Sequence, residues 1–284
     1  MVRFDAYTAT TEALKPADVL PWFFEGGHMN RTLRQGRGFH TFGERVSVLD
    51  DGAEVGSVSW GGRQGDRVMV EVKGEGTPAF VERLRQAGPH RCTRVDSCAD
   101  FERPGAFEQI LVPVLSVKER FDLYGERRGD WDKPELGRTQ YLGSPQSAIR
   151  ARLYEKGKQP EYRHLERFDL CRLEIQVRPQ KDAKHTFGGL SALEVWGASK
   201  WTRDLAAQVL EQQLDPHPPG TIRRDTQREE ALRWMCQQYG KHLVSLAVDL
   251  GGWKEVGLTL AEMVQEGAAR AARARRSKLA GGKG

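Results

Sequence analysis

Two acidic residues stand inside apolar segments of this chain and could do chemistry together. Asp96 ends the segment Arg-Val-Asp (94–96), and Glu174 ends the similar segment Arg-Leu-Glu (172–174). Alternate residues of a strand share one face, so each acid points away from the aliphatic residue before it. If the two strands are neighbours, the carboxylates project together, which is costly unless they share a proton or a cation.

A divalent ion such as Mg²⁺ or Mn²⁺ is the common solution for such a pair of carboxylates, because these ions prefer oxygen ligands. Asp100 follows Asp96 closely and could add a third ligand. The alternative is a structural network of salt bridges, in which the acids pair with the arginines two positions before them or with Arg152. The spacing of the residues leaves both interpretations open.

Cations and an aromatic ring surround the second acid. The strand-like segment 148–159 supplies Arg150, Arg152, Lys156 and Lys158, with Tyr154 among them. Cations with an interleaved aromatic ring on a sheet suit the backbone and stacked bases of single-stranded nucleic acid. A solvated strand face has the same composition, so that alternative also stays open.

The C-terminal residues 267–284 are strongly basic. They contain no acid and carry these cations: Arg270, Arg273, Arg275, Arg276, Lys278 and Lys283. The formal net charge of the whole chain is +5, so the remainder carries only −1. This tail is typical of an arm that neutralises phosphates, and a solubilising tail is the alternative. Any nucleic-acid site on the rest of the chain must therefore be a local patch.

The elements that position these residues are strands first and helices later. Segments 54–62 and 67–76 alternate apolar and polar residues between glycines, which predicts a hairpin or meander. Segment 77–88 begins with Thr-Pro, spaces its apolar residues at helical intervals and ends at glycine, which predicts a helix. Residues 92–101 follow as the strand that holds Asp96.

The second half of the sheet region is less regular. Pro113 argues against an uninterrupted helix over residues 105–123, so only the second half of that segment is predicted to be helical. Segments 138–145 and 148–157 indicate a hairpin-like pair of strands, and 168–177 indicates the strand of Glu174. From residue 190 onward the pattern is helical, over 199–214, 226–251 and 258–276.

This order of elements predicts an α+β fold: a central, mostly antiparallel sheet with helices packed on it and a helical C-terminal part. The two similar segments at 94–96 and 172–174 suggest that the sheet has two similar halves. We expect a sheet domain over 1–190, a helical part over 191–266 and a basic tail over 267–284.

Composition indicates a soluble, cytoplasmic protein. No apolar run approaches the roughly 20 residues that span a bilayer, and the N-terminus does not resemble a signal peptide. The spacing of Cys92, Cys98, Cys171 and Cys236 indicates neither a zinc site nor a disulfide framework, so we expect reduced thiols in the core.

Four segments resemble the replication initiation factor family of rolling-circle plasmids and filamentous phages. They are RVDSCADF (94–101), RTQYLGSPQSAIRARLYEKGKQ (138–159), RLEIQVR (172–178) and VWGASKWTRDL (195–205). The likeness extends from roughly residue 54 to residue 240, and the segments follow one another in the family's order.

The resemblance implies a protein that binds a double-strand origin in a bacterial cell. It would nick one strand with a tyrosine, stay attached to the 5′ phosphate and leave a 3′ hydroxyl as primer. Its partners would be duplex and single-stranded DNA, with a host helicase or polymerase as a further partner. Asp96 and Glu174 would hold a Mg²⁺ or Mn²⁺ ion that polarises the phosphate. The backbone would be held by cations of the strands: Arg150, Arg152, Lys156 and Arg172.

The reaction that the resemblance implies needs a tyrosine as nucleophile. The chain has six tyrosines, and segment 175–197, which follows the acid strand, has none. Tyr239, near a helix end before a glycine, is the first candidate, and Tyr154 is the second; a packing role is the alternative for each. Tyr141 belongs to a strand and is expected in the core.

Histidine ligands are not indicated, because the seven histidines include no His-hydrophobe-His pair of the kind found in relaxases. Two other functions stay open. The same fold could bind an origin or a promoter without nicking it. A ribonuclease or general nuclease using the same acids would cleave without a covalent adduct.

Overall fold

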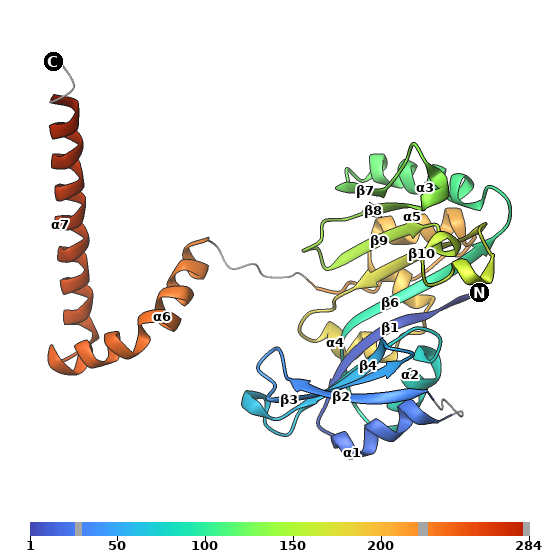
Figure 1. The fold of residues 1–284 in the computed structure, drawn as a ribbon, viewed down its shortest axis with the longest axis horizontal. Coiled ribbons are helices and arrows are strands. Elements are labelled where there is room, and N and C mark those ends of the chain that lie inside the picture. The colour runs from blue at the N-terminus through green and yellow to red at the C-terminus, as the bar shows by residue number, and fades with distance from the viewer. Residues whose placement is uncertain (26–29, 221–226, 281–284) are drawn as a thin grey trace. The chain divides into compact units, whose positions relative to one another are not determined.

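A computed structural model describes residues 1–25, 30–220 and 227–280 of the 284-residue chain. The chain divides into two compact units, Met1–Ile222 and Arg223–Gly284. The first unit holds the sheet and the helices packed on it. The second unit consists of α6 (Gln227–Asp249) and α7 (Trp253–Ala280) (Figure 1).

The first unit is built on one ten-stranded sheet, with the order β2-β3-β4-β5-β1-β6-β10-β9-β8-β7. Every neighbouring pair is antiparallel. The α+β prediction is confirmed, as are the hairpins predicted over 54–76 and 138–157. The strands are β1 (Val2–Thr11), β2 (Arg31–Arg37), β3 (Glu44–Asp50), β4 (Ala53–Trp60), β5 (Val68–Lys73), β6 (Arg91–Glu102), β7 (Gly125–Gly129), β8 (Arg138–Leu142), β9 (Ile149–Tyr154) and β10 (Leu170–Val177).

The sheet has two similar halves. In each half a long central strand is followed by a helix, then a meander of four strands whose last strand pairs with the first, then a second helix. The first half runs from β1 to α2 and the second from β6 to α4, so β1 and β6 meet at the centre. The helices are α1 (Pro16–Val19), α2 (Thr77–Ala87), α3 (Ala106–Arg120), α4 (Ala183–Gly189) and α5 (Lys200–Val209).

The two halves do not divide the chain as the acid segments suggested. The strands of Asp96 and Glu174, β6 and β10, are direct neighbours inside the second half. They are the first and last strands of one half and are therefore not equivalent to each other. Their shared Arg-aliphatic-acid sequence reflects one common position, an apolar face turned to the helices and a polar face turned away.

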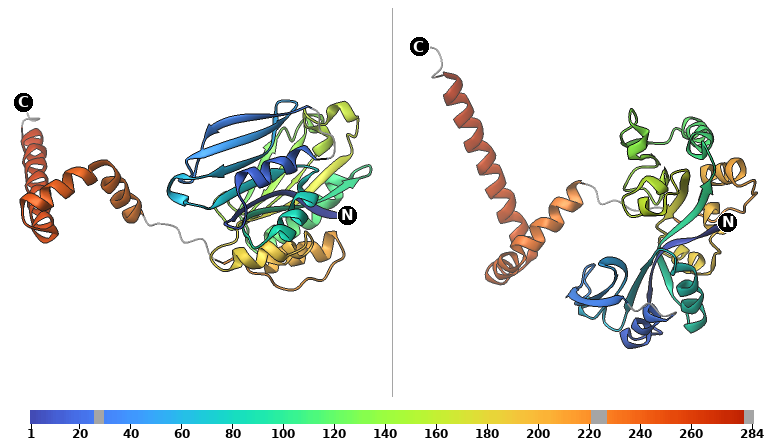
Figure 2. Two further views of the ribbon diagram at one scale, coloured as in Figure 1. Left: turned by 90° about the horizontal axis from the view of Figure 1, so that it is seen from below. Right: turned by 45° about the vertical axis from the view of Figure 1, so that its right-hand side comes forward.

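The helices gather on one face of the sheet, along one side in the right-hand view of Figure 2. Valines of the central strands, such as Val72 and Val95, pack there with Phe80 of α2 and Phe107 of α3. Trp196 is fully buried in the same layer, and its indole N–H donates to the Ser97 hydroxyl at 2.9 Å. In the described part of the first unit, no α-helix packs on the opposite face of the sheet, which is called the open face here (Figure 2). Polar side chains that could do chemistry lie on it.

Helix α3 is longer than predicted, because it begins at Ala106 and includes Pro113. A proline inside a helix removes one backbone hydrogen bond and costs about 3 kcal/mol. Buried apolar residues lie on both sides of it, with Phe107 and Ile110 before and Val114 and Val117 after. Burying this whole stripe against the sheet offsets the cost, so the prediction that the helix occupies only the second half of 105–123 was wrong.

The predicted helix over 199–214 is shorter than expected. Ser199 caps α5 by accepting a hydrogen bond from the Thr202 amide at 3.1 Å, but the helix ends at Val209. Glu211 adopts a positive φ of 56°, a conformation that a helix does not continue through.

Helix α7 includes much of the basic tail and reaches Ala280, while residues 281–284 lie outside the described residues. Among the described residues, no helix combines the length and apolar character that crossing a membrane requires. Cys92, Cys98 and Cys171 are buried, whereas Cys236 is exposed on α6. The expectation of four core thiols was therefore wrong for Cys236.

Candidate active site

Side chains of the open face form cross-strand rows, because directly paired residues of neighbouring strands share a face. One row runs from Tyr141 on β8 to Arg152 on β9 and Glu174 on β10. The next row contains Arg150, Gln176 and Asp96. The sheet thus brings Asp96, Glu174 and a tyrosine into two adjacent rows on one face.

Asp96 and Glu174 lie on the same face of neighbouring strands, as the sequence predicted. Asp96 pairs directly with Gln176, two residues from Glu174, so the acids are diagonal neighbours. Both are almost fully buried, at 2% exposure each. Two carboxylates enclosed together repel each other, so each needs a compensating group.

Arginines supply that compensation in this structure. Arg94 contacts both oxygens of Asp96, with Nε to Oδ1 at 2.9 Å and Nη2 to Oδ2 at 2.5 Å. Arg152 donates from Nη2 to Glu174 Oε2 at 2.8 Å. These are the salt bridges of the structural alternative raised by the sequence, and they hold both carboxylates on the open face.

The surroundings of Glu174 raise the pKa of its carboxyl group. Burial, followed by the negative charge of Asp96, raises the pKa of Glu174 to about 7, although Arg152 opposes the shift. A buried carboxyl near a second carboxylate is a common arrangement at functional sites. The carboxyl is therefore poised between its charged and neutral forms near neutral pH.

A small cavity of about 110 Å³ opens in front of Glu174. Its lining includes Tyr141 and three arginines, Arg94, Arg150 and Arg152. The guanidinium of Arg150 lies over the Tyr141 ring, 3.9 Å from its centre. A phenol, a carboxyl and three cations thus converge on one hollow of the open face.

Tyr141 is the functional candidate that sequence reasoning missed, since it was expected in the core. It is half-buried and faces the cavity, whereas its neighbour Leu142 is buried on the helix side. The signal was present in the sequence. Leu142 must face the core of a half-buried strand, so Tyr141 must face the other way.

The two tyrosines favoured from the sequence lie elsewhere. Tyr154 is on the open face of β9, but it is only 4% exposed, and the Arg152 guanidinium lies 4.6 Å from its ring centre. Burial, followed by the charge of Glu174, raises the pKa of the Tyr154 phenol. Tyr239 is 49% exposed on α6 and belongs to the second compact unit.

Asp100 and Arg172 form a separate ion network on the same face. Arg172 is 1% exposed and donates to both oxygens of Asp100, at 2.5 and 2.7 Å, and to Asp5 at 2.5 Å. Arg3 also donates to Asp100 at 3.0 Å. Although burial opposes it, the hydrogen bonds and charge of Arg172 hold the pKa of Asp100 at about 2.

The cations expected from the sequence to hold DNA are mostly engaged by groups of the protein itself. Lys156 is 5% exposed, with its ammonium 3.9 Å from Asp100 and 4.4 Å from the Tyr162 ring centre. Lys158 pairs with Glu155 at 2.7 Å. Arg150 pairs with Glu126 at 2.8 Å as well as covering Tyr141. The tail arginines Arg270, Arg273, Arg275 and Arg276 lie in α7.

The acids of the open face bear on the prediction of a divalent ion. The described part of the chain contains no group of three or more His, Cys, Asp or Glu residues placed to hold a metal. Magnesium, however, is often bound by one or two carboxylates together with substrate phosphates and water. Asp96 and Glu174 are two carboxylates on one face, each paired with an arginine in this structure, and Asp100 is engaged by Arg172 and Arg3.

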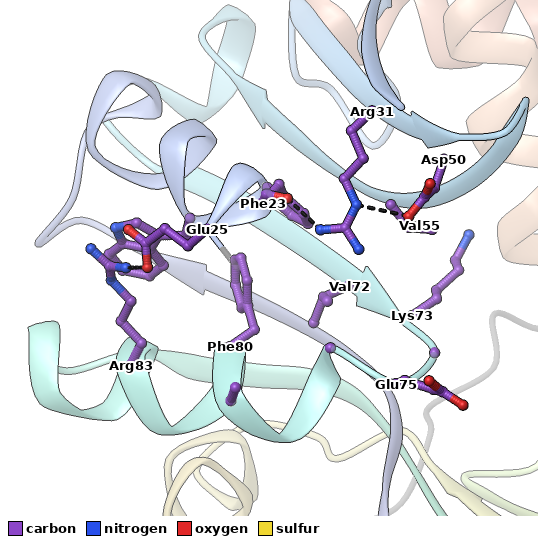
Figure 3. A pocket seen from close by; sticks show the side chains of 14 residues that line it. Phe23, Glu25, Arg31, Asp50, Val55, Val72, Lys73, Glu75, Phe80 and Arg83 are labelled. Atoms are coloured by element: carbon purple, nitrogen blue, oxygen red, sulfur yellow. Dashed lines mark hydrogen bonds and ion pairs between the residues drawn. The ribbon is translucent and has the colours of Figure 1, made fainter. Parts of the chain in front are cut away.

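Another cavity, of about 420 Å³, lies between α2 and the strands of the first half (Figure 3). Two of its arginines are paired with acids of the same lining. Arg31 binds Asp50 at 2.9 Å and the Phe23 carbonyl, and Arg83 binds Glu25. These contacts tie the segment 20–25 to β2, β3 and α2, so the cavity is best explained as part of the packing between them.

Comparison with known proteins adds little to this geometry. No family model matches the sequence, and no curated protein matches it. One similar solved structure is titled as the rolling circle replication initiator protein from Geobacillus stearothermophilus. The two sequences are 18% identical, the TM-score is 0.47, and the likeness covers 69% of this chain and 83% of that one.

Proposed function

We propose that this protein starts rolling-circle DNA replication by cutting one strand of an origin with Tyr141. The observation that carries the proposal is the convergence of Tyr141, Glu174 and three arginines on one cavity of the open face. The sequence resemblance to replication initiation factors supports the same reaction. Tyr141 takes the place of Tyr239 and Tyr154 as nucleophile, because it lines the cavity beside Glu174.

The reaction is a transfer of a phosphodiester from one oxygen to another. The Tyr141 hydroxyl gives its proton to water, its oxygen attacks the scissile phosphorus, and the bond from phosphorus to the 3′ oxygen breaks. The 3′ oxygen takes up a proton and leaves as a hydroxyl, which serves as primer. The 5′ phosphate remains on the tyrosine, so the bond can be re-formed later without an energy cofactor.

The arginines have two tasks in this reaction. Arg150 lies over the Tyr141 ring, so its positive charge stabilises the phenolate as the proton leaves. Arg94 and Arg152 line the same cavity and can bind the nonbridging oxygens of the phosphate. Charge builds on those oxygens in the transition state, and preorganised cations stabilise it there.

Asp96 and Glu174 would hold a Mg²⁺ or Mn²⁺ ion, which supplies Lewis-acid polarisation of the phosphate when bound. For this role Arg94 and Arg152 must release the carboxylates and turn to the DNA phosphates. Such an exchange keeps the charge balanced, because the incoming phosphate replaces the carboxylate as the partner of each arginine.

The test is incubation of the purified protein with single-stranded DNA of the replicon that carries its gene, in the presence of Mn²⁺. A denaturing gel and peptide mass analysis then detect any DNA-linked peptide. We expect an adduct on the peptide that contains Tyr141. An adduct on Tyr154 or Tyr239 would contradict the assignment of the nucleophile but retain the reaction.

A binding protein that does not cut is the second candidate. It is favoured by the existing salt bridges, since Arg94 and Arg152 already neutralise the two acids without a metal. In that case the same incubation gives tight binding, intact DNA and no adduct. Cleavage without any adduct would instead indicate a hydrolytic nuclease.

A further inference from the structure

A larger cavity lies beside the candidate active site, on the same open face. It encloses about 730 Å³, and Arg94 lines both cavities. Strands β1, β5 and β6 form its floor, and its walls come from the segment before β3 and from α4. A cavity of this size is ample for a small ligand, whose binding sites commonly enclose about 300–1,000 Å³.

The charge of this cavity is mostly positive. Its cations are Arg67, Arg91, Arg94, Arg178 and Lys184, and Glu71 is its one lining acid among the described residues. Glu71 is already matched by Lys73 at 3.2 Å. Arg67 is matched by Glu12 at 3.0 Å, and Arg94 by Asp96.

Three of the cations have no carboxylate partner in the described part of the chain. Arg91 donates to the Lys181 carbonyl at 3.5 Å, Arg178 donates to the Pro145 carbonyl at 2.9 Å and to Gln176 Oε1 at 3.0 Å, and Lys184 has no salt bridge there. Burial first, and then nearby positive charges, lower the pKa of Lys184 and of Arg178. Cations held close together in this way favour an anion between them.

One wall of the cavity is aromatic. Phe39 is 37% exposed, and Arg45 lies over its ring at 5.0 Å from the centre. The segment that carries it is held in place, because the Gln64 amide donates to the His40 carbonyl at 3.1 Å and to the Thr41 hydroxyl at 2.8 Å. An exposed ring on a fixed segment is a suitable surface for stacking a base.

We propose that this cavity binds one unstacked nucleotide of the strand to be cut, with its phosphate on Arg91, Arg178 and Lys184 and its base against Phe39. The inference rests on the proposed function and names the part of the DNA that the open face grips next to the scissile phosphate. Because Arg94 borders both cavities, neighbouring phosphates of one strand can occupy them together. Single-stranded DNA suits this site, since its bases are already unpaired.

The first experiment measures binding of a fluorescent single-stranded oligonucleotide to the full chain by anisotropy, in EDTA so that no cutting occurs. Lys184→Gln removes one unmatched cation, and Lys181→Gln is the matched control, because Lys181 is exposed and outside the cavity. We expect the first variant to bind roughly tenfold more weakly and the second to bind as the wild type does. Equal affinities for the two variants would overturn the proposal.

The second experiment asks whether a base occupies the cavity. A single abasic nucleotide is moved along the oligonucleotide, and affinity is measured for the wild type and for Phe39→Ala. At one position we expect a loss of about tenfold in the wild type that disappears in Phe39→Ala, since stacking on the ring is then already lost. A loss of the same size in both proteins at every position would refute base binding by Phe39.

These measurements separate the two proposals. Adduct formation with Mn²⁺ is measured on the same proteins with saturating DNA. The cavity proposal alone is refuted if the wild type forms an adduct and the Lys184 and Lys181 variants bind DNA equally well. The cutting reaction alone is refuted if the wild type forms no adduct while Lys184→Gln weakens DNA binding and Phe39→Ala abolishes the response to the abasic nucleotide.

Discussion

Tyr141 and Glu174 lie in one cross-strand row, with Arg152 paired directly to both of them. Strands are about 4.8 Å apart in the sheet, so the two residues are separated by two strand spacings. The guanidinium of Arg152 can therefore bind either of two anions: Glu174, as observed, or a phosphate held at Tyr141. This shared arginine is what links the acid to the proposed nucleophile.

Replacing the proposed nucleophile gives the most direct prediction. Tyr141→Phe keeps the ring under Arg150 but removes the attacking oxygen, so the covalent adduct should fall to background while DNA binding in EDTA stays unchanged. The measurement is adduct yield on a denaturing gel beside an anisotropy titration. Tyr154→Phe and Tyr239→Phe are the controls and should retain the adduct; loss in either one with retention in Tyr141→Phe would reassign the nucleophile.

Metal dependence should follow the diagonal pair. Asp96→Asn and Glu174→Gln each remove one anionic ligand, so half-maximal adduct formation should need at least about tenfold more Mn²⁺ than in the wild type. The measurement is a Mn²⁺ titration of adduct yield. Asp204→Asn is a control, because Asp204 pairs with exposed Arg120 outside the cavity. A Mn²⁺ requirement that is the same in all four proteins would exclude Asp96 and Glu174 as ligands.

Much of the sheet was predictable from local pattern. Alternating residues and glycine turns predicted the hairpins of β4 with β5 and of β8 with β9. The alternation of side chains along a strand predicted that Asp96 and Glu174 lie on one face if their strands are neighbours. What local pattern does not contain is the pairing of β6 with β10, which joins residues far apart in the sequence. The prediction that the carboxylates of Asp96 and Glu174 project together assumed this pairing, which the structure contains.

The site residues were harder to predict because their roles depend on burial. Arg150 and Arg172 look alike in the sequence, yet Arg150 lines the cavity, whereas Arg172 is 1% exposed and bound by acids. The strand register accounts for the difference, since it places the acid Asp100 directly opposite Arg172 and the neutral Gln176 directly opposite Arg150. The cavity of Arg178 and Lys184 is assembled from several distant segments, and no sequence motif signals it.

The raised pKa of Glu174 predicts a pH-dependent stability. An unfolded glutamate has a pKa of about 4.3, and the folded value is about 7. The folded state therefore holds a proton that the unfolded state has lost over this range, so stability should fall as pH rises through it. Urea unfolding in EDTA between these pH values should show a flatter profile for Glu174→Gln. An unchanged slope would place the proton elsewhere.

The ion network at Arg172 should matter for stability more than for DNA binding. Arg172→Ala leaves Asp100 and Asp5 without their buried partner, so the free energy of unfolding should fall by about 3 kcal/mol or more. Arg167→Ala is the matched control, because its pair with Glu102 is exposed to water and its loss should lower the free energy of unfolding far less. Urea denaturation measures both. Equal losses in the two variants would mean that the burial of Arg172 has no energetic consequence.

The basic end of α7 should control the salt dependence of DNA binding. Replacing its four arginines by glutamine keeps a helix-forming side chain while removing four charges; they are Arg270, Arg273, Arg275 and Arg276. If all four contact phosphates of single-stranded DNA, the slope of log affinity against log salt should decrease by up to about three, at about 0.7 per contact. The measurement is anisotropy at several NaCl concentrations.

The control for this slope is Lys184→Gln, which removes one cation from the open face of the sheet and should change the slope by less than about one. An unchanged slope after the loss of all four arginines would show that the tail neutralises no phosphate. Its charge would then serve solubility, and the electrostatic part of DNA binding would rest on the arginines of the sheet. A steep decrease would instead mean that the tail supplies the nonspecific attraction, because phosphate contacts position DNA while base contacts select the sequence.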